Sequence, residues 1–404
     1  PMPGAHRGIL VRVIGGGGDD AFHHQARDRG RTVFYDDRGR NHVDPGGARV
    51  DRRAWEPPER DPVWGGSTPD WGSAMSPLAP YAVWQLNVGP VIGVGPQWTR
   101  YGFRRVPYAQ TLGLRALWAP LEAGFGGMLR YERWRTNRPA LVWLAARGSN
   151  FEDVRFHGLG NDTPDDDEDD EYLVEQTQVR VQAAYEARPG RWRLFAGPAA
   201  RWTDPREVRA ATTPVLGDEA FWQLGAAGGV ELDARDQRAY PRRGGRLAVL
   251  AEGYGSDLSG PFARFEGQAA GYLSVPGYAG PTLALRVGAQ KAVGEFPFQE
   301  SATLGGLGTL RGYVFQRFRG DAALSGSAEL RARIAYVNLG LARGDLGVFG
   351  LVDAGRVYVD GDSPGGWHTG YGGGLSFLTL GQAITVAYTH GERGSAYATL
   401  GMPF

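Results

Sequence analysis

Side chains that commonly perform catalysis are few in this chain of 404 residues. Cysteine is absent, which removes thiolate nucleophiles, disulfides and cysteine-ligated zinc. The seven histidines are scattered apart from His23 and His24, and no H-E-x-x-H pattern places two of them on one helix face. The sequence therefore predicts that the chain is not an enzyme and has no catalytic residue, no cofactor and no metal site.

Two segments nevertheless contain residues that could bind cations. Gly15–His23 has the spacing of the G-G-x-G-x-D-x-U-x calcium repeat of β-roll proteins, and Asp37–Asn41 resembles a degraded second copy. Because a single copy cannot stack alone, calcium binding is the less favoured interpretation of this segment. The acidic run Asp165–Glu171 is expected to be a solvated outer loop, with cation binding near lipopolysaccharide as the alternative.

The elements that must position any functional side chain change in character near residue 78. Residues 1–78 are rich in Gly, Asp, Arg and Pro, and only Gly8–Ile14 is apolar enough for a strand. We expect a short irregular segment here, either a linker or the tail of an upstream β-roll-like domain. No signal peptide opens the chain, which suggests a mature or trimmed part of a longer protein.

Residues 79–404 repeat a different pattern, in which apolar and polar residues alternate between turn residues. In Phe262–Val275, for example, Phe265 and Leu273 share one face, whereas Arg264 and Glu266 share the other. About sixteen such strands are expected. Their approximate spans are 79–86, 91–103, 109–119, 122–135, 139–150, 172–188, 191–203, 220–235, 244–255, 262–276, 280–292, 325–338, 346–356, 368–379, 382–391 and 395–404.

Strand length and charge favour a membrane barrel over a soluble β-sandwich or propeller. Many segments have about ten residues or more, the length that crosses a bilayer at a tilt, whereas sandwich strands are usually shorter. The polar faces carry charges such as Arg180, Arg286 and Arg331, which suit a wet lumen better than a dry core. The predicted fold is therefore all-β: a 16-stranded antiparallel transmembrane β-barrel spanning residues 79–404.

The connections between the expected strands alternate between short and long. Short ones include 135–138 and 187–190, and long ones include 151–171 and 292–324. Outer-membrane barrels have short periplasmic turns and long outer loops, so the N-terminus is expected in the periplasm. The 44 basic and 44 acidic side chains cancel, which gives no electrostatic case for nucleic acid.

The segment Leu304–Tyr313, which follows the eleventh expected strand, carries the most specific motif. Its sequence LGGLGTLRGY resembles the inward loop of the BamA-type superfamily of outer-membrane insertases and translocases, also called the bacterial surface antigen family. The resemblance implies a loop tip, Arg311-Gly312-Tyr313, that lies in the lumen and whose arginine pairs with a carboxylate. Asp353 is the acceptor that the resemblance implies, and Glu329, on the inward face of the twelfth strand, is a second candidate.

Further segments extend this resemblance over about 330 residues in the same order. They include Phe156–Thr163 in the third outer loop, Leu351–Gly355 in the thirteenth strand and the glycine-rich Tyr371–Leu375. The turn before the ninth strand resembles the periplasmic turn motif of the family, with Arg235, Asp236, Pro241 and Gly244. The C-terminal residues Met402 and Phe404 resemble the signal read by bacterial barrel-assembly machinery, although Pro403 departs from it.

The resemblance implies an integral protein of the bacterial outer membrane that inserts or translocates polypeptides through a weak seam between its first and last strands. The implied partners are outer-membrane lipid and lipopolysaccharide, the barrel-assembly machinery during biogenesis, and a polypeptide substrate, but no nucleic acid. Residues 1–78 do not resemble the two-helix POTRA domains of the family. Two alternatives therefore stay open: a membrane anchor or exporter for an upstream fused domain, and a passive porin-like channel.

Overall fold

The computed structural model describes residues 10–15, 18–25, 32–55, 69–164, 171–206, 208, 215–277, 280–338, 340 and 343–402. The chain divides into two compact units. The smaller unit contains Pro1–Gly72 together with two turns, Tyr101–Ala109 and Arg135–Arg138. The larger unit contains the remaining residues and therefore almost all of the repeating strands.

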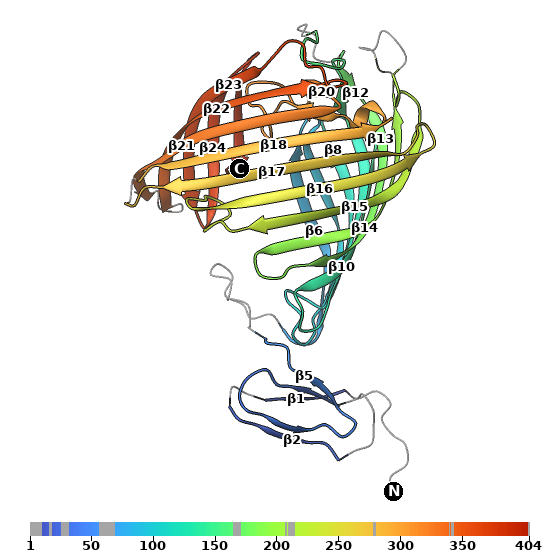
Figure 1. Ribbon diagram of the computed structural model, residues 1–404, viewed down its shortest axis with the longest axis vertical. Helices are drawn as coiled ribbons and strands as arrows, with labels where there is room; N and C mark the ends of the chain where they lie inside the picture. The colour runs from blue at the N-terminus through green and yellow to red at the C-terminus, as the bar shows by residue number, and fades with distance from the viewer. Residues whose placement is uncertain are drawn as a thin grey trace. The chain divides into compact units, whose positions relative to one another are not determined.

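The larger unit is a sixteen-stranded antiparallel sheet that curls into a barrel, with its strands adjacent in chain order (Figure 1). The predicted number and direction of the strands are confirmed. The strands are β6 (Ser73–Gln85), β7 (Gly89–Arg100), β8 (Gln110–Ala119), β9 (Gly124–Trp134), β10 (Ala140–Ser149), β13 (Gln176–Ala187), β14 (Trp192–Pro205), β15 (Phe221–Asp233), β16 (Gly244–Ser256), β17 (Phe262–Ser274), β18 (Thr282–Gly294), β21 (Ala322–Asn338), β22 (Arg343–Tyr358), β23 (His368–Thr379), β24 (Gln382–His390) and β25 (Gly394–Leu400).

Strand β6 begins at Ser73, six residues before the expected start. Pro77 and Pro80 obscure the alternation, and the register with β7 shifts between Ser76 and Ala79. Proline is tolerated at such irregularities and at sheet edges, where a ladder hydrogen bond can be missing. The first strand is therefore longer than its residue pattern suggests.

The two faces of the sheet differ as the alternation predicts. Large apolar side chains such as Val287, Leu330 and Leu224 remain 59–64% exposed on the outer face. A continuous exposed apolar band of this kind would be an aggregation hazard in water, and it is the surface that lipid covers in a membrane barrel. No helix in the described ranges is long and apolar enough to cross a membrane.

Two loops bring short elements against the inner face of the sheet. The connection between β10 and β13 contains β11 (Val154–Arg155) paired with β12 (Leu173–Val174). The connection between β18 and β21 contains the 3-10 helix η1 (Phe298–Glu300) and the hairpin β19 (Ala302–Leu304) with β20 (Phe318–Gly320). Leu304, Leu310 and Phe318 from this second loop pack with Ala323 of β21 and Val357 of β22 in a buried apolar cluster. This cluster holds the loop against the barrel wall, that is, the sixteen-stranded sheet.

The smaller unit has more regular structure than its sequence predicts. It contains five short strands, β1 (Val11–Ile14), β2 (Ala21–His23), β3 (Thr32–Tyr35), β4 (His42–Asp44) and β5 (Arg49–Asp51). The odd-numbered strands form one parallel sheet and the even-numbered strands another. Strands of three or four residues are too short to show an alternating pattern. Their pairing partners also lie far away in the sequence, so local patterns do not reveal them.

Candidate functional site

The tip of the loop between β18 and β21 is held by a buried cluster of charges. Arg311 is 1% exposed and binds Asp353 of β22 through two side-chain hydrogen bonds, Nε to Oδ2 at 2.7 Å and Nη2 to Oδ1 at 2.6 Å. Its backbone N–H donates to the same carboxylate at 3.0 Å, and its Nη2 donates to Ser327. Arg311 also forms an ion pair with Glu329 of β21, so it binds both expected acceptors.

The same cluster extends toward the turn between β15 and β16. Arg331, which is fully buried, donates to the second oxygen of Glu329 at 2.8 Å, and its guanidinium lies 6.0 Å from the ring of Tyr240. Tyr240 is a buried residue of that turn. A continuous path of contacts therefore runs from Asp353 through Arg311, Glu329 and Arg331 to Tyr240 in the turn between β15 and β16.

Three of the four predicted turn-motif residues shape this connection directly. Arg235 binds Asp233 with Nε and Nη2, each at 2.9 Å, and the Asp236 carboxylate accepts the backbone N–H groups of residues 242 and 243. Gly244 has φ +93°, and a Cβ there would lie 2.1 Å from the carbonyl oxygen of residue 234. Pro241 is buried beside Tyr240 in the chain. The turn is thus closed by its own polar groups.

Glycines let the loop tip lie directly against the wall. A Cβ at Gly370 of β23 would be 1.9 Å from the carbonyl oxygen of Arg311, and a Cβ at Gly312 would be 2.6 Å from the backbone at residues 390 and 391. Gly312 also has φ +88°, a conformation that favours glycine. Tyr313 donates its hydroxyl to the Thr369 carbonyl at 3.2 Å. All three residues of the predicted tip therefore contact the region of β23 to β25.

A second group of buried charges anchors the base of the loop. Glu300 of η1 is 1% exposed and pairs with Arg201 of β14 and, at 2.8 Å, with Arg264 of β17. Arg319 is fully buried and donates to the carbonyl oxygens of Arg155 and Phe298. Sequence reasoning did not assign roles to Glu300 or Arg319, because nothing in the local pattern shows that these loop residues are buried.

The loop between β10 and β13 is bonded to the loop between β18 and β21. Arg317 donates to Thr163 at 2.6 Å and to Glu392 at 2.7 Å, which ties both loops to the connection between β24 and β25. Asn161 exchanges hydrogen bonds with both backbone groups of Val357, at 2.8 and 2.9 Å. The segment Phe156–Thr163, noted only for its resemblance, thus contributes Asn161 and Thr163 to the site.

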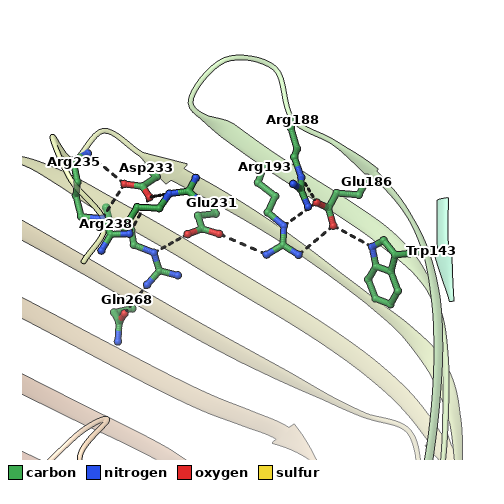
Figure 2. Close-up of polar contacts among 10 residues, drawn as sticks. Trp143, Glu186, Arg188, Arg193, Glu231, Asp233, Arg235, Arg238 and Gln268 are labelled. Atoms are coloured by element: carbon green, nitrogen blue, oxygen red, sulfur yellow. Dashed lines mark hydrogen bonds and ion pairs between the residues drawn. The ribbon is translucent and has the colours of Figure 1, made fainter. Parts of the chain in front are cut away.

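The inner wall near the short turns carries a ladder of charges over neighbouring strands (Figure 2). Glu186 is fully buried and accepts from Trp143 at 3.1 Å, from Arg188 at 2.6 Å and from Arg193 at 3.0 Å. Arg193 continues to Glu231 at 3.7 Å. The inward charges that a soluble core could not accommodate are therefore paired across strands, in a lumen lined by both signs.

A cavity of about 480 Å³ lies where the two ends of the sheet meet the loop tip. Strands β6 and β25 are the ends of the sheet order, and no pairing between them is found in the described part of the chain. The cavity is lined by Trp84 at the end of β6, by Tyr397 of β25 and by Arg311, Gly312 and Tyr313 of the loop tip. The loop tip therefore forms part of the boundary between the lumen and this seam.

Of the predicted C-terminal signal, only Met402 can be placed. It packs against the cluster of Phe349, Leu351 and Ala387 and accepts a hydrogen bond from Thr385 at 3.4 Å. Phe404 lies outside the described residues, as does most of the acidic run Asp165–Glu171.

Gly361–Gly365 has the G-x-S-x-G spacing of hydrolase nucleophile turns, which open a helix after a strand. Here the segment connects two strands, and Ser363 donates to the Val357 carbonyl at 2.5 Å and accepts from Asn161 and Arg356. None of the hydrogen bonds found for Ser363 in the described ranges involves a histidine. The serine therefore has a structural role in the turn.

Comparison with known proteins agrees with this architecture. The Omp85 superfamily domain matches residues 147–381. The fold is similar to that of BamA from Haemophilus ducreyi lacking POTRA domains 1–3, with a TM-score of 0.59 and 12% identity over 82% of this chain and 70% of that one. It is also similar to CdiB from Escherichia coli, with a TM-score of 0.51 and 13% identity over 83% of this chain and 63% of that one.

No protein with curated annotation matches the chain significantly. The domain match nevertheless covers more than half of the residues, and it includes the loop tip, its two acceptors and the turn before β16. The chain therefore belongs to the Omp85 superfamily and is a bacterial outer-membrane β-barrel of the insertase and translocase type.

Proposed function

We propose that this barrel inserts or translocates polypeptides at the seam between β6 and β25. The observation that carries the proposal is the cavity at this seam, which is lined by both end strands and by the loop tip. An end strand presents unpaired N–H and C=O groups, and an incoming extended segment can pair with them. The cavity gives such a segment a place beside both end strands.

In this proposal the ion pairs of Arg311 with Asp353 and Glu329 hold the loop in the lumen while the seam binds a polypeptide. Asp353 and Glu329 belong to neighbouring wall strands, so their shared bonds with Arg311 brace the wall near the seam as well as the loop. The turn motif around Arg235 and Asp236 would brace the opposite end through Tyr240. Met402 and Phe404 would serve as the signal by which barrel-assembly machinery inserts this chain.

We further infer that the chain ahead of β6, which begins at Ser73, forms a periplasmic module preceding the barrel. Two turns, Tyr101–Ala109 and Arg135–Arg138, belong to the same unit as the N-terminal strands. Both turns lie on the side with the short connections, and short turns of outer-membrane barrels face the periplasm. Lipid and lipopolysaccharide would surround the outer apolar band.

Cross-linking to a polypeptide substrate tests the seam. The chain has no cysteine, so Ala396→Cys on β25 and the control Ala226→Cys on β15 each create a single thiol on an exposed position. An outer-membrane barrel precursor bearing one cysteine should form a disulfide adduct with the first variant at least about tenfold more than with the second, because effective concentration is high only at the binding seam. Equal adducts at both positions would contradict the proposal.

The N-terminal strands favour a second candidate, an exporter or anchor for a domain preceding residue 1. Their parallel stacking is a repeat architecture, which normally continues over several rungs. Protease added to intact cells separates the two candidates. A periplasmic module is protected and is cut only after the outer membrane is opened, whereas an exported module is cut on intact cells.

A further inference from the structure

The N-terminal strands form two successive rungs whose corners lie one above the other. Strand β1 pairs in parallel with β3, and β2 pairs in parallel with β4. Beyond the strand ends the ladder continues, because the N–H of Gly15 donates to Tyr35 and the N–H of His42 donates to Asp20. Gly15 and Asp20 therefore lie directly over the corner that runs from Asp36 to Asn41.

Side chains connect the two corners to each other. The backbone N–H of Asp20 donates to the side-chain oxygen of Asn41 at 2.7 Å, and the N–H of Arg40 donates to Asp19 at 2.8 Å. Gly39 has φ +89°, and a Cβ there would be 2.0 Å from the carbonyl oxygen of Gly18. The stacked second copy, which a single motif in the sequence could not establish, is therefore present.

Two carboxylates converge at these stacked corners. Oδ2 of Asp20 and Oδ1 of Asp36 each lie 3.0 Å from the position that a Cβ on Gly15 would take. Asp36 is only 4% exposed, and its Oδ1 is buried without a hydrogen-bond partner among the described residues. A buried carboxylate oxygen without a hydrogen-bond partner is unfavourable unless a cation neutralises it, and the carboxylate of Asp20 is close enough to share such a cation.

We propose that Asp20 and Asp36 bind one calcium ion at the corner between the two rungs. Calcium accepts carboxylate, carbonyl and water oxygens in flexible geometry, whereas zinc prefers nitrogen and sulfur and magnesium demands a near-ideal octahedron. The corner offers carboxylates from two different turns, and Asp20 occupies the aspartate position of the calcium-repeat spacing in Gly15–His23. The ion joins the rungs and orders this unit.

The affinity should be modest. No group of three or more histidine, aspartate or glutamate side chains arranged for a metal is found in the described ranges, so two carboxylates must be completed by carbonyl and water oxygens. Calcium sites with few charged ligands in extracellular modules bind in the range of about 10⁻⁴ to 10⁻³ M. This range suits a site that fills outside the cytosol.

Hydrogen–deuterium exchange of the full chain in detergent tests the site locally, so other cation-binding regions do not interfere. In EDTA the amides of residues 18–25 and 32–44 should exchange quickly, and calcium at about 5 mM, several times the expected dissociation constant, should slow them about fivefold or more. Asp36→Asn should abolish this calcium effect. The control Asp44→Asn, on an exposed position of β4, should retain it.

The exchange rate without calcium gives a second readout, because there the Asp36→Asn substitution should slow exchange instead of abolishing a protection. Without calcium, Asp36→Asn should exchange more slowly than the wild type, because a neutral amide removes the buried charge beside Asp20. If Asp36→Asn fails to fold, Asp20→Asn decides the matter by the same loss of the calcium effect. No calcium effect in the wild type, an undiminished effect in the folded variant, or an equal effect of magnesium would overturn the proposal.

Discussion

At the scale of single residues, buried arginines hold the interior of this barrel together. Arg311, Arg319 and Arg331 are among its largest fully buried side chains, and each has hydrogen-bond acceptors around it. A guanidinium offers five donors in a fixed fork, so one arginine can tie a loop to two wall strands at once. A lysine in the same place would satisfy only part of this geometry.

Replacing Arg311 by alanine should weaken the folded barrel substantially. The change leaves Asp353 and part of Glu329 buried without their cation, a loss of about 3–5 kcal/mol for a buried pair. The temperature at which the folded band disappears on heat-modifiability gels should fall clearly. Arg206→Ala is the matched control, since its pair with Glu175 is largely exposed and worth roughly 0–1 kcal/mol; equal behaviour of the two variants would count against the pinning role.

Asp153, in the loop between β10 and β13, should make stability depend on pH. Burial, with the nearby carboxylates of Glu122 and Glu175, raises the pKa of Asp153 to about 7. Its folded pKa lies above its unfolded value near 3.9, so its protonated form favours folding, and this contribution is lost as the pH rises through about 7.

Asp153→Asn should therefore raise the free energy of unfolding in detergent at pH 8 by an amount on the order of 2 kcal/mol, which is measured as a higher melting temperature. At pH 4 the substitution should change the melting temperature little. The exposed Asp360→Asn serves as control, because asparagine also tolerates the φ of +52° found there. A variant effect that is the same at both pH values would show that the carboxyl group does not titrate as expected.

At the scale of elements, the loop between β18 and β21 and the wall strands fit each other closely. The loop tip approaches the wall closely where glycines leave room, and the apolar residues of the loop join a cluster with wall residues. Its position thus depends on β23 as much as on its own sequence.

Gly370→Ala tests this fit. The added methyl would meet the Arg311 carbonyl at 1.9 Å, so the loop tip must shift and the protein should show frequent conductance fluctuations in planar bilayers. Gly267→Ala, on β17, is the control, because nothing lies within 4 Å of its new Cβ. Silent recordings from Gly370→Ala, with an unchanged melting temperature, would mean that the close approach is not needed.

At the scale of the whole molecule, the barrel has a charged inner wall, and two of its own loops are held against this wall. The loop between β10 and β13 is bonded to the loop between β18 and β21 through Thr163 and Arg317. Both loops are also bonded to strand β22, through Asn161 and Arg311. This arrangement argues against the passive-channel alternative.

Purified protein in planar bilayers should therefore show low conductance, and removal of residues 306–317 should raise it several-fold, because these residues include the tip that reaches the wall. A large steady conductance of the wild type would instead favour a porin. A deletion variant that folds but stays closed would show that other segments fill the lumen.

The sequence by itself determined the sixteen strands, the faces of the barrel and the identity of the pinned arginine. Strands of about ten residues repeat the alternation often enough to be recognised, and the motif around Arg311 is specific. The start of β6 was harder to recognise, because prolines and a register shift interrupt its pattern.

Only the tertiary structure decided how distant segments meet. Glu300 and Arg319 lie in a loop without periodicity. Glu300 pairs with Arg201 of β14, and Arg319 donates to the Arg155 carbonyl in the loop between β10 and β13, so both depend on segments far away in sequence. The rungs of the N-terminal unit depend in the same way on pairings across many residues, as between Ile14 and Tyr35. Local residue patterns report the period of a strand, but the partners of a buried charge are set by the closing of the whole chain around it.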